Sequence, residues 1–307
     1  MGAYIRIRLL AAIPVIVGVS ILVFISLYLL PGDPVQAIAG EVPLDKARVE
    51  ELRELYGLND PPWEQYGRFA VRALQGDLGT SLGTRRPVLG EILTFLPATL
   101  QLTGAAMLFA VLIGVTLGTI AAIRAHTWVD SLTMVLALGG VSIPSFWLGL
   151  MLLIVFSVWL GLVPSTGTEG VHRLILPAFT LGYGAAAIIA RLTRSSLLEA
   201  MSQDYVVTAR SKGLVERTVI IRHALKNALI PVITIAGLQV GNLLSGAVIV
   251  ETVFSRQGVG RMLVNGILGK DLPLVQGTIL FVATAYVLIN ILTDLLYAYV
   301  DPRIRFR

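Results

Sequence analysis

The residue types that perform covalent or metal chemistry are scarce in this sequence of 307 residues. There is no cysteine, and the three histidines, His126, His172 and His223, lie outside the long apolar stretches. Neither a His-Glu-x-x-His pattern nor a Gly-rich phosphate loop of the Walker type occurs. Within those apolar stretches the one carboxylate is Asp294, whereas an intramembrane aspartyl protease needs two. We therefore expect no catalytic residue, no metal site and no cofactor bound by this chain.

A set of neutral polar residues interrupts the apolar stretches. Polar side chains in membrane spans usually face the bundle interior or a water-filled path. The residues that we expect to line such a translocation path are Ser142, Ser145, Gln239, Asn242, Ser245 and Asn290. Hydroxyl and amide groups suit a zwitterionic or backbone-bearing solute better than a bare ion. Hydrogen bonding between helices is the alternative interpretation for each of these residues.

A polar and basic segment, residues 204–227, separates two of the apolar stretches. A cationic segment of this length on the cytoplasmic side of a membrane protein is a natural docking surface. The sequence contains no chain of titratable groups that would relay protons and no clear inverted repeat of the kind found in many carriers. A transporter with no energy source of its own needs an external motor, and this segment is the candidate attachment point.

The elements that position these residues are predicted to be transmembrane helices. Hydrophobic residues make up 55% of the chain and charged residues 14%, against about 25% charged in soluble domains. Several apolar stretches reach the roughly 20 residues that cross a bilayer. The six predicted spans are Leu9–Leu30, Ala98–Ile123, Leu136–Leu162, Leu174–Leu192, Leu229–Val250 and Gly277–Tyr299. The fold class is therefore an all-α polytopic membrane protein.

The distribution of lysine and arginine predicts that both termini are cytoplasmic. With the termini inside, the inner side holds 13 of the 24 basic residues and the short outer loops hold 4. The long loop 31–95 is discounted, because long loops translocate largely regardless of charge. The net charge of +5 is thus read as positive-inside bias rather than as nucleic-acid binding. The first span is too long for a signal-peptide core, so we expect it to be retained, with cleavage as the alternative.

One local feature is predicted in the outer loop and another within the third span. In the loop 31–95, Asp45 is expected to begin a helix that Gly57 ends, and Trp63, Tyr66 and Phe69 recur at helical spacing in a second helix. These helices would form a small cap on the outer membrane face. In the third span, Pro144 predicts a kink that serves either as a gate hinge or only for packing.

The basic segment resembles the EAA loop of ABC importer permeases. Residues 207–209 followed by Gly213 match its small-residue triplet and glycine, although Val207 replaces the usual glutamate and Leu225-Lys226 replaces the usual Leu-Pro. Those departures match the oligopeptide/dipeptide/nickel permease family, whose loop is similar to residues 204–213 and 223–231 here. Further motifs of that family occur at 30–34, 76–81, 87–88, 96–100, 250–254, 258–260 and 301–305. The Leu-Pro-Gly-Asp-Pro motif after the first span and the long outer loop favour the B-type permease of this family over its C-type paralogue.

The resemblance implies a type I ABC importer permease with six transmembrane helices and a large extracytoplasmic loop between helices 1 and 2. It divides the chain into an N-terminal part, 1–95, and a core permease domain, 96–307, that carries a cytoplasmic coupling loop at 193–228. A short coupling helix is expected around Thr208–Glu216. The residues implied in contact with the ATPase are Thr208, Ala209, Arg210, Lys212, Gly213, Glu216 and Arg217. Ala209 would allow close approach, and Gly213 would allow a sharp turn. The cations Arg210, Lys212 and Arg217 would pair with acids of the ATPase.

The partners that the resemblance implies are a paralogous C-type permease, two cytoplasmic ATPase subunits and an extracytoplasmic solute-binding protein. ATP and magnesium would be used by the ATPase subunits, in a bacterial inner membrane. The expected function is the uptake of dipeptides or oligopeptides. Glutathione or nickel chelates are the alternatives within the family, and a self-contained secondary carrier or channel is the alternative from another class.

Overall fold

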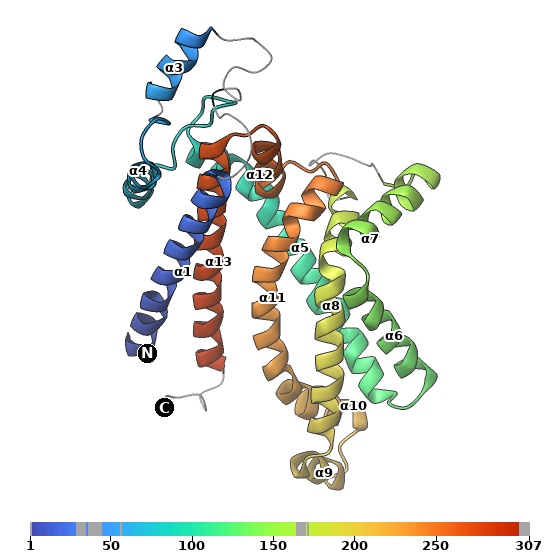
Figure 1. The fold of residues 1–307 in the computed structure, drawn as a ribbon. Coiled ribbons are helices and arrows are strands. Elements are labelled where there is room, and N and C mark those ends of the chain that lie inside the picture. The colour runs from blue at the N-terminus through green and yellow to red at the C-terminus, as the bar shows by residue number, and fades with distance from the viewer. Residues whose placement is uncertain are drawn as a thin grey trace. The chain divides into compact units, whose positions relative to one another are not determined.

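The regular secondary structure of the protein is helical throughout the parts that the structure, a computed structural model, describes (Figure 1). These parts are residues 2–28, 35, 45–55, 57–163, 170 and 172–300. In them the sole β feature is an isolated antiparallel bridge between Thr80 and Pro87. The family motifs at 30–34 and 301–305 and the side chain of Asp294 lie outside this description.

Five helices of the described chain are long and apolar enough to cross a membrane. They occupy Arg8–Ser26, Val88–Ile123, His172–Met201, Glu216–Val253 and Leu272–Thr293. A bent pair of helices, Trp128–Ser142 and Ser145–Trp159, supplies a sixth if it is counted as one span. The prediction of an all-α polytopic protein is confirmed, and the helices extend well beyond several predicted limits.

The described chain groups into two compact units. Unit 1 comprises residues 1–97 and 257–291, and unit 2 comprises residues 98–256 and 292–307. Unit 1 contains α1 (Gly2–Tyr28), α3 (Lys46–Leu55), α4 (Pro62–Leu74), the start of α5 (Val88–Ile123), α12 (Val259–Leu268) and most of α13 (Leu272–Val300). The division into 1–95 and 96–307 stays a prediction.

The two short helices expected in the outer loop are present in unit 1. The α3 helix begins after Asp45, whose carbonyl oxygen accepts the first helical hydrogen bonds, and Gly57 follows its end with a φ of +62°. The α4 helix begins at Pro62, a residue type that fits a first helical turn because it lacks the N–H group that would go unpaired there. Unit 1 has an apolar core. Its buried residues are Leu78, Val88, Ile92, Val259, Met262 and Leu274.

Unit 2 is built around α8 (His172–Met201), which packs against α11 (Leu225–Val253), α6 (Trp128–Ser142) and α7 (Ser145–Leu152). Small residues bring α5 close to α8. A β-carbon added at Gly114 would lie 2.8 Å from the carbonyl oxygen of Ala186. The remaining elements of unit 2 are η1 (Leu153–Trp159), α9 (Asp204–Ser211), α10 (Glu216–Thr218) and η2 (Val219–Ala224), of which η1 and η2 are π-helical.

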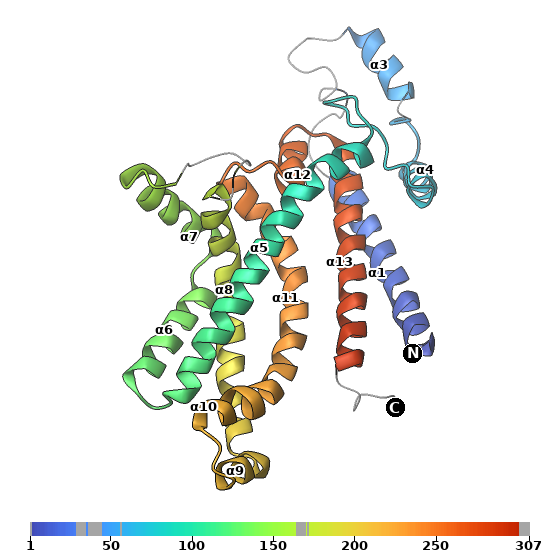
Figure 2. The same cartoon turned by 180° about the vertical axis from the view of Figure 1, so that it is seen from behind.

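The predicted third span is not a single kinked helix. The α6 helix ends at Ser142, and the following helix leaves at an angle of 107° (Figures 1 and 2). Ile143 between them is extended, with φ −83° and ψ 123°, the conformation that a residue before proline prefers. Pro144 then immediately precedes α7, which begins at Ser145. The position of the irregularity was thus predicted correctly, but the helix is broken at Pro144 rather than kinked.

Candidate coupling surface and polar path

The basic segment folds as a short helix followed by a tight turn. The α8 helix ends at Met201, and α9 then runs from Asp204 to Ser211 across the end of α8 (Figure 1). Gly213 follows with a φ of +76°, and the helix restarts at Glu216. The short helix predicted around Thr208–Glu216 therefore has different limits, Asp204–Ser211, and the turn at Gly213 follows its end. Its role in coupling stays a prediction. The sharp turn expected at Gly213 is present.

The inner face of α9 is fixed to its own chain. Val206 is fully buried and Ala209 is nearly so, in a cluster with Leu197 of α8 and Val219 and Ile220 of η2. The Ala209 methyl group packs inward against this cluster, and its expected part in the approach of a partner stays a prediction. The small side chain lets α9 lie close to α8 and η2.

A salt bridge closes the turn on its outer side. Arg210 on α9 donates two hydrogen bonds to the Glu216 carboxylate, at 2.7 and 3.1 Å. This pairing raises the pKa of the Arg210 guanidinium above its usual range. Arg210 was expected to pair with an acid of a partner, whereas here it links the two sides of the Gly213 turn. Lys212 and Arg217 remain exposed.

The exposed face of α9 and the turn mixes cationic and apolar groups. Thr208, Lys212 and Arg217 are exposed there. The apolar members of this surface, which were not predicted, are Tyr205, Val207, Leu214 and Val215. The available signal was the presence of these apolar residues within a basic segment. Hereafter these seven residues and Gly213 are called the α9 surface.

The segment after the turn is helical rather than a loop. Residues 216–253 form one helical stretch through α10, η2 and α11, so Arg222, His223 and Lys226 lie on the helix that continues into the fifth predicted span. In the predicted coupling loop 193–228, the chain is non-helical only at residues 212–215 and 202–203. Two helices, α8 before α9 and the stretch 216–253 after it, thus connect the α9 surface to the bundle.

Three of the predicted path residues share α11. The Asn242 side-chain amide donates to the Gln239 side-chain oxygen at 2.9 Å. Asn242 and Ser245, three residues apart, lie exposed, whereas Gln239 is buried. An exposed polar strip on an apolar helix is costly in lipid and is therefore expected to face protein or water.

The other predicted path residues lie elsewhere. Ser142 and Ser145 flank the break before Pro144, where Ser142 is exposed and Ser145 half-buried. Asn290 is on the α13 part of unit 1 and is half-buried. A single path that joins all six residues stays a prediction.

Two buried polar links between helices were missed at the sequence level. In the first, Thr99 of α5 donates to the fully buried Glu251 of α11 at 2.6 Å. In the second, Arg194 of α8 donates to both oxygens of Asp130 of α6, at 2.5 and 2.7 Å. All four residues lie outside the predicted spans or at their edges. The available signal was the charge of Asp130, Arg194 and Glu251 next to apolar stretches, and Thr99 gave none.

In the part of the chain that the structure describes, no group of three or more His, Asp or Glu residues is arranged to hold a metal ion.

Comparison with known protein families shows which family this chain belongs to. The family described as binding-protein-dependent transport system inner membrane component matches residues 114–306, and its N-terminal component matches residues 1–103. This chain belongs to that family. It is therefore a multi-pass membrane component of a binding-protein-dependent transport system, and its family is that of ABC importer permeases.

Several relatives of this permease align over its whole length. The dipeptide transport system permease protein DppB of Alkalihalophilus pseudofirmus is 45% identical over 334 residues, covering 100% of both chains. The glutathione transport system permease protein GsiC of Escherichia coli O6:H1 is 44% identical over 304 residues, covering 99% of both. The resemblance to the peptide permease family is thus confirmed.

Solved structures confirm the fold of the permease. The MetNI methionine ABC transporter in inward-facing conformations matches with a TM-score of 0.60 at 20% identity, over 69% of this chain and 97% of that chain. An amino acid ABC transporter with histidines matches with a TM-score of 0.53 at 16% identity, over 70% of this chain and 95% of that chain. The permease therefore has the type I importer fold.

Proposed function

We propose that this permease takes up dipeptides or short oligopeptides as one subunit of an ATP-driven importer. The observation that carries the proposal is the 45% identity, over its full length, to a dipeptide permease. The polar strip of Gln239, Asn242 and Ser245 on α11 supports it, because amides and hydroxyls match the hydrogen-bonding groups of a peptide backbone.

The α9 surface is the proposed contact for an ATPase subunit. It combines exposed apolar side chains with cationic ones, and protein interfaces likewise contain both apolar and polar groups. The buried Val206 and Ala209 fix α9 to α8 and η2, so that a force on α9 is transmitted to α11 as a rigid element. Closure of two ATPase subunits on ATP would then shift the permease toward an outward-facing state, and hydrolysis would return it.

The same mechanism requires further subunits. A second, C-type permease would complete the passage, and a solute-binding protein would deliver peptide from outside. ATP and magnesium would be held by the ATPase subunits, while this chain supplies no catalytic group of its own.

Uptake by the reconstituted importer tests the proposal. Vesicles that contain the permease with its partner subunits should take up a labelled dipeptide only when the ATPase subunits have ATP. Uptake that persists with the permease alone would identify a self-contained carrier instead.

Glutathione is the second candidate substrate, because the glutathione permease relatives are almost equally similar, at 44% identity. A tenfold excess of unlabelled glutathione should leave dipeptide uptake unchanged if the peptide proposal is right. Strong inhibition, together with ATP-dependent uptake of labelled glutathione, would assign the importer to glutathione.

The cations of the α9 surface give a separate test of docking. Lys212→Ala combined with Arg217→Ala should weaken retention of the ATPase subunits about three- to tenfold, since each exposed charge pair contributes roughly 0.2–1 kcal/mol. Pull-down with the tagged permease measures this. Arg85→Ala combined with Arg86→Ala removes the same charge from unit 1 and should leave retention unchanged. Full retention by the Lys212/Arg217 variant would contradict the assignment.

A further inference from the structure

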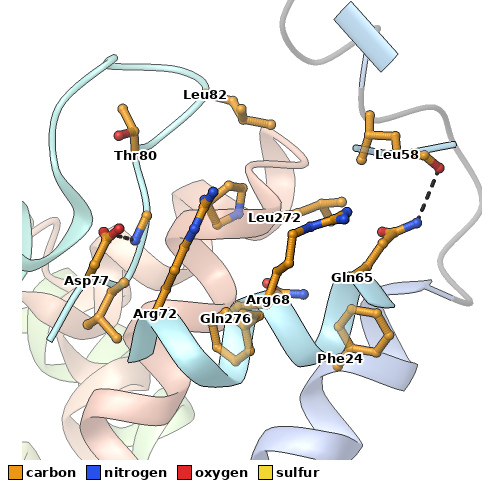
Figure 3. Close-up of a pocket in the computed structure, with 14 residues that line it drawn as sticks. Phe24, Leu58, Gln65, Arg68, Arg72, Asp77, Thr80, Leu82, Leu272 and Gln276 are labelled. Carbon is orange, nitrogen blue, oxygen red and sulfur yellow. Dashed lines mark hydrogen bonds between the residues drawn. The ribbon is translucent and has the colours of Figure 1, made fainter. Parts of the chain in front are cut away.

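A cavity of about 280 Å3 lies against α4 in unit 1 (Figure 3). One wall is α4, and the opposite wall is the beginning of α13, with Leu272, Pro273 and Gln276. Phe24 of α1 closes one side, and the segment 77–82 closes another. The proposed transport function assigns no role to this cavity.

The cavity lies at the ends of two apolar spans. Phe24 is two residues before the end of the span Arg8–Ser26, and Leu272 is the first residue of the span Leu272–Thr293. At about 1.5 Å of rise per helical residue, Phe24 is within roughly 3 Å of the end of its span. The cavity is therefore at the depth where hydrocarbon gives way to headgroups.

The α4 helix has the position and the surface of an interfacial helix. It runs across α1 rather than along it (Figures 1 and 2), held by a 2.9 Å hydrogen bond between Ser20 and Tyr66 and by the edge-on packing of Phe24 on Tyr66. Trp63, Val71 and Leu74 are 72%, 56% and 89% exposed. A helix that lies in the interface buries such side chains among lipid headgroups and chains.

Two arginines of α4, one helical turn apart, point into the cavity (Figure 3). Arg68 is engaged, since it pairs with Asp60 at 2.6 Å and donates to the carbonyl of Gly57 at 3.1 Å. For the Arg72 guanidinium, the described residues offer neither a hydrogen bond nor an ion pair. The nearby Asp77 carboxylate already accepts a hydrogen bond from the Gly79 backbone N–H. The cavity thus presents one available guanidinium, and its walls combine apolar side chains with the polar Gln65, Asp77, Thr80 and Gln276.

We propose that this cavity binds the phosphate of a membrane phospholipid, with Arg72 as its principal ligand. A guanidinium binds a phosphate diester through two parallel hydrogen bonds. The apolar walls formed by Phe24, Leu82 and Leu272 accommodate the glycerol and the first methylenes of the acyl chains. A bound lipid would join α1, α4 and α13, three elements that belong to the same compact unit.

Native mass spectrometry of the full-length permease, purified with its accompanying subunits and titrated with phosphatidylglycerol, tests the proposal. Arg72→Gln should weaken phosphatidylglycerol binding about tenfold, the loss expected for one charge-assisted contact. Arg86→Gln is the matched control, because Arg86 is exposed in the same compact unit but does not line the cavity, and phosphatidylglycerol binding by this variant should equal that of the unmodified protein. Leu272→Trp fills the cavity without a change of charge and should reduce binding by a similar factor.

Two further arms separate the sources of the phosphate. Diacylglycerol, which has the same acyl chains and no phosphate, should bind at least tenfold more weakly than phosphatidylglycerol. Soluble glycerophosphoglycerol should fail to displace the lipid at equal concentration. Equal displacement would show a site for a soluble phosphate ester and overturn the lipid assignment. Unchanged phosphatidylglycerol binding in both Arg72→Gln and Leu272→Trp would show that the cavity is not a lipid-binding site. The peptide-uptake proposal would not be affected by that result.

Discussion

Gly213 adopts a backbone conformation that most residue types avoid. Its φ of +76° is in the left-handed region, which costs an L-residue roughly 1–2 kcal/mol. No neighbouring atom lies within 4 Å of a β-carbon built at this position, so the requirement for glycine comes from the backbone and not from packing. The turn sets the angle between α9 and the helix that continues into α11.

Substitution of Gly213 is accordingly expected to uncouple ATP hydrolysis from transport. Gly213→Val should lower ATP-dependent uptake about tenfold, because a β-branched residue is the least suited to positive φ. Gly213→Asn is the matched variant, since asparagine tolerates this region, and it should keep most of the uptake. Uptake by reconstituted vesicles, normalised to the amount of inserted protein, gives the result. Equal loss in both variants would mean that the position senses side-chain size instead.

Helices α6 and α8 are joined by a bidentate ion pair. Asp130 is 5% exposed, and its two oxygens accept hydrogen bonds from Arg194; one of them also accepts the backbone N–H of His126 at 3.0 Å. A carboxylate this buried is stabilised by its partner, and the removal of the partner leaves an uncompensated charge. The pair therefore fixes α6 in register against α8, the helix to which α9 is attached.

A double-mutant cycle across this pair should show strong coupling. Arg194→Met should destabilise the permease by about 2–4 kcal/mol, somewhat less than the largest effects reported for fully buried pairs because Arg194 is partly exposed. Asp130→Asn combined with Arg194→Met should recover part of that loss, since no lone charge remains. Thermal unfolding of the purified protein measures both. Additive losses in the double variant would show that the two groups act independently.

At the scale of the whole molecule, the sequence predicted what depends on nearby residues. The helix after Asp45, the stop at Gly57, the turn at Gly213 and the apolar spans follow from local chemistry and composition, and the structure contains them. Contacts between distant residues were not predictable. Ser81 donates to Asp271 at 2.5 Å across 190 positions, which ties the outer segment to the start of α13. The break at Pro144 was located, but its 107° angle depends on the packing of α7 against α8 and α11.

The orientation of the chain is the remaining whole-molecule prediction, and the absence of cysteine from the sequence makes it directly measurable. Because lysine and arginine are enriched on the inner side, Lys212 is expected in the cytoplasm and Arg86 outside. A single Lys212→Cys variant should react with a membrane-impermeant maleimide only after the cells are opened. A single Arg86→Cys variant should react in intact cells. Both positions are exposed, so failure to label cannot be attributed to burial once denatured protein reacts normally. Labelling of Lys212→Cys in intact cells would place the α9 surface away from any cytoplasmic ATPase and would refute the proposed coupling.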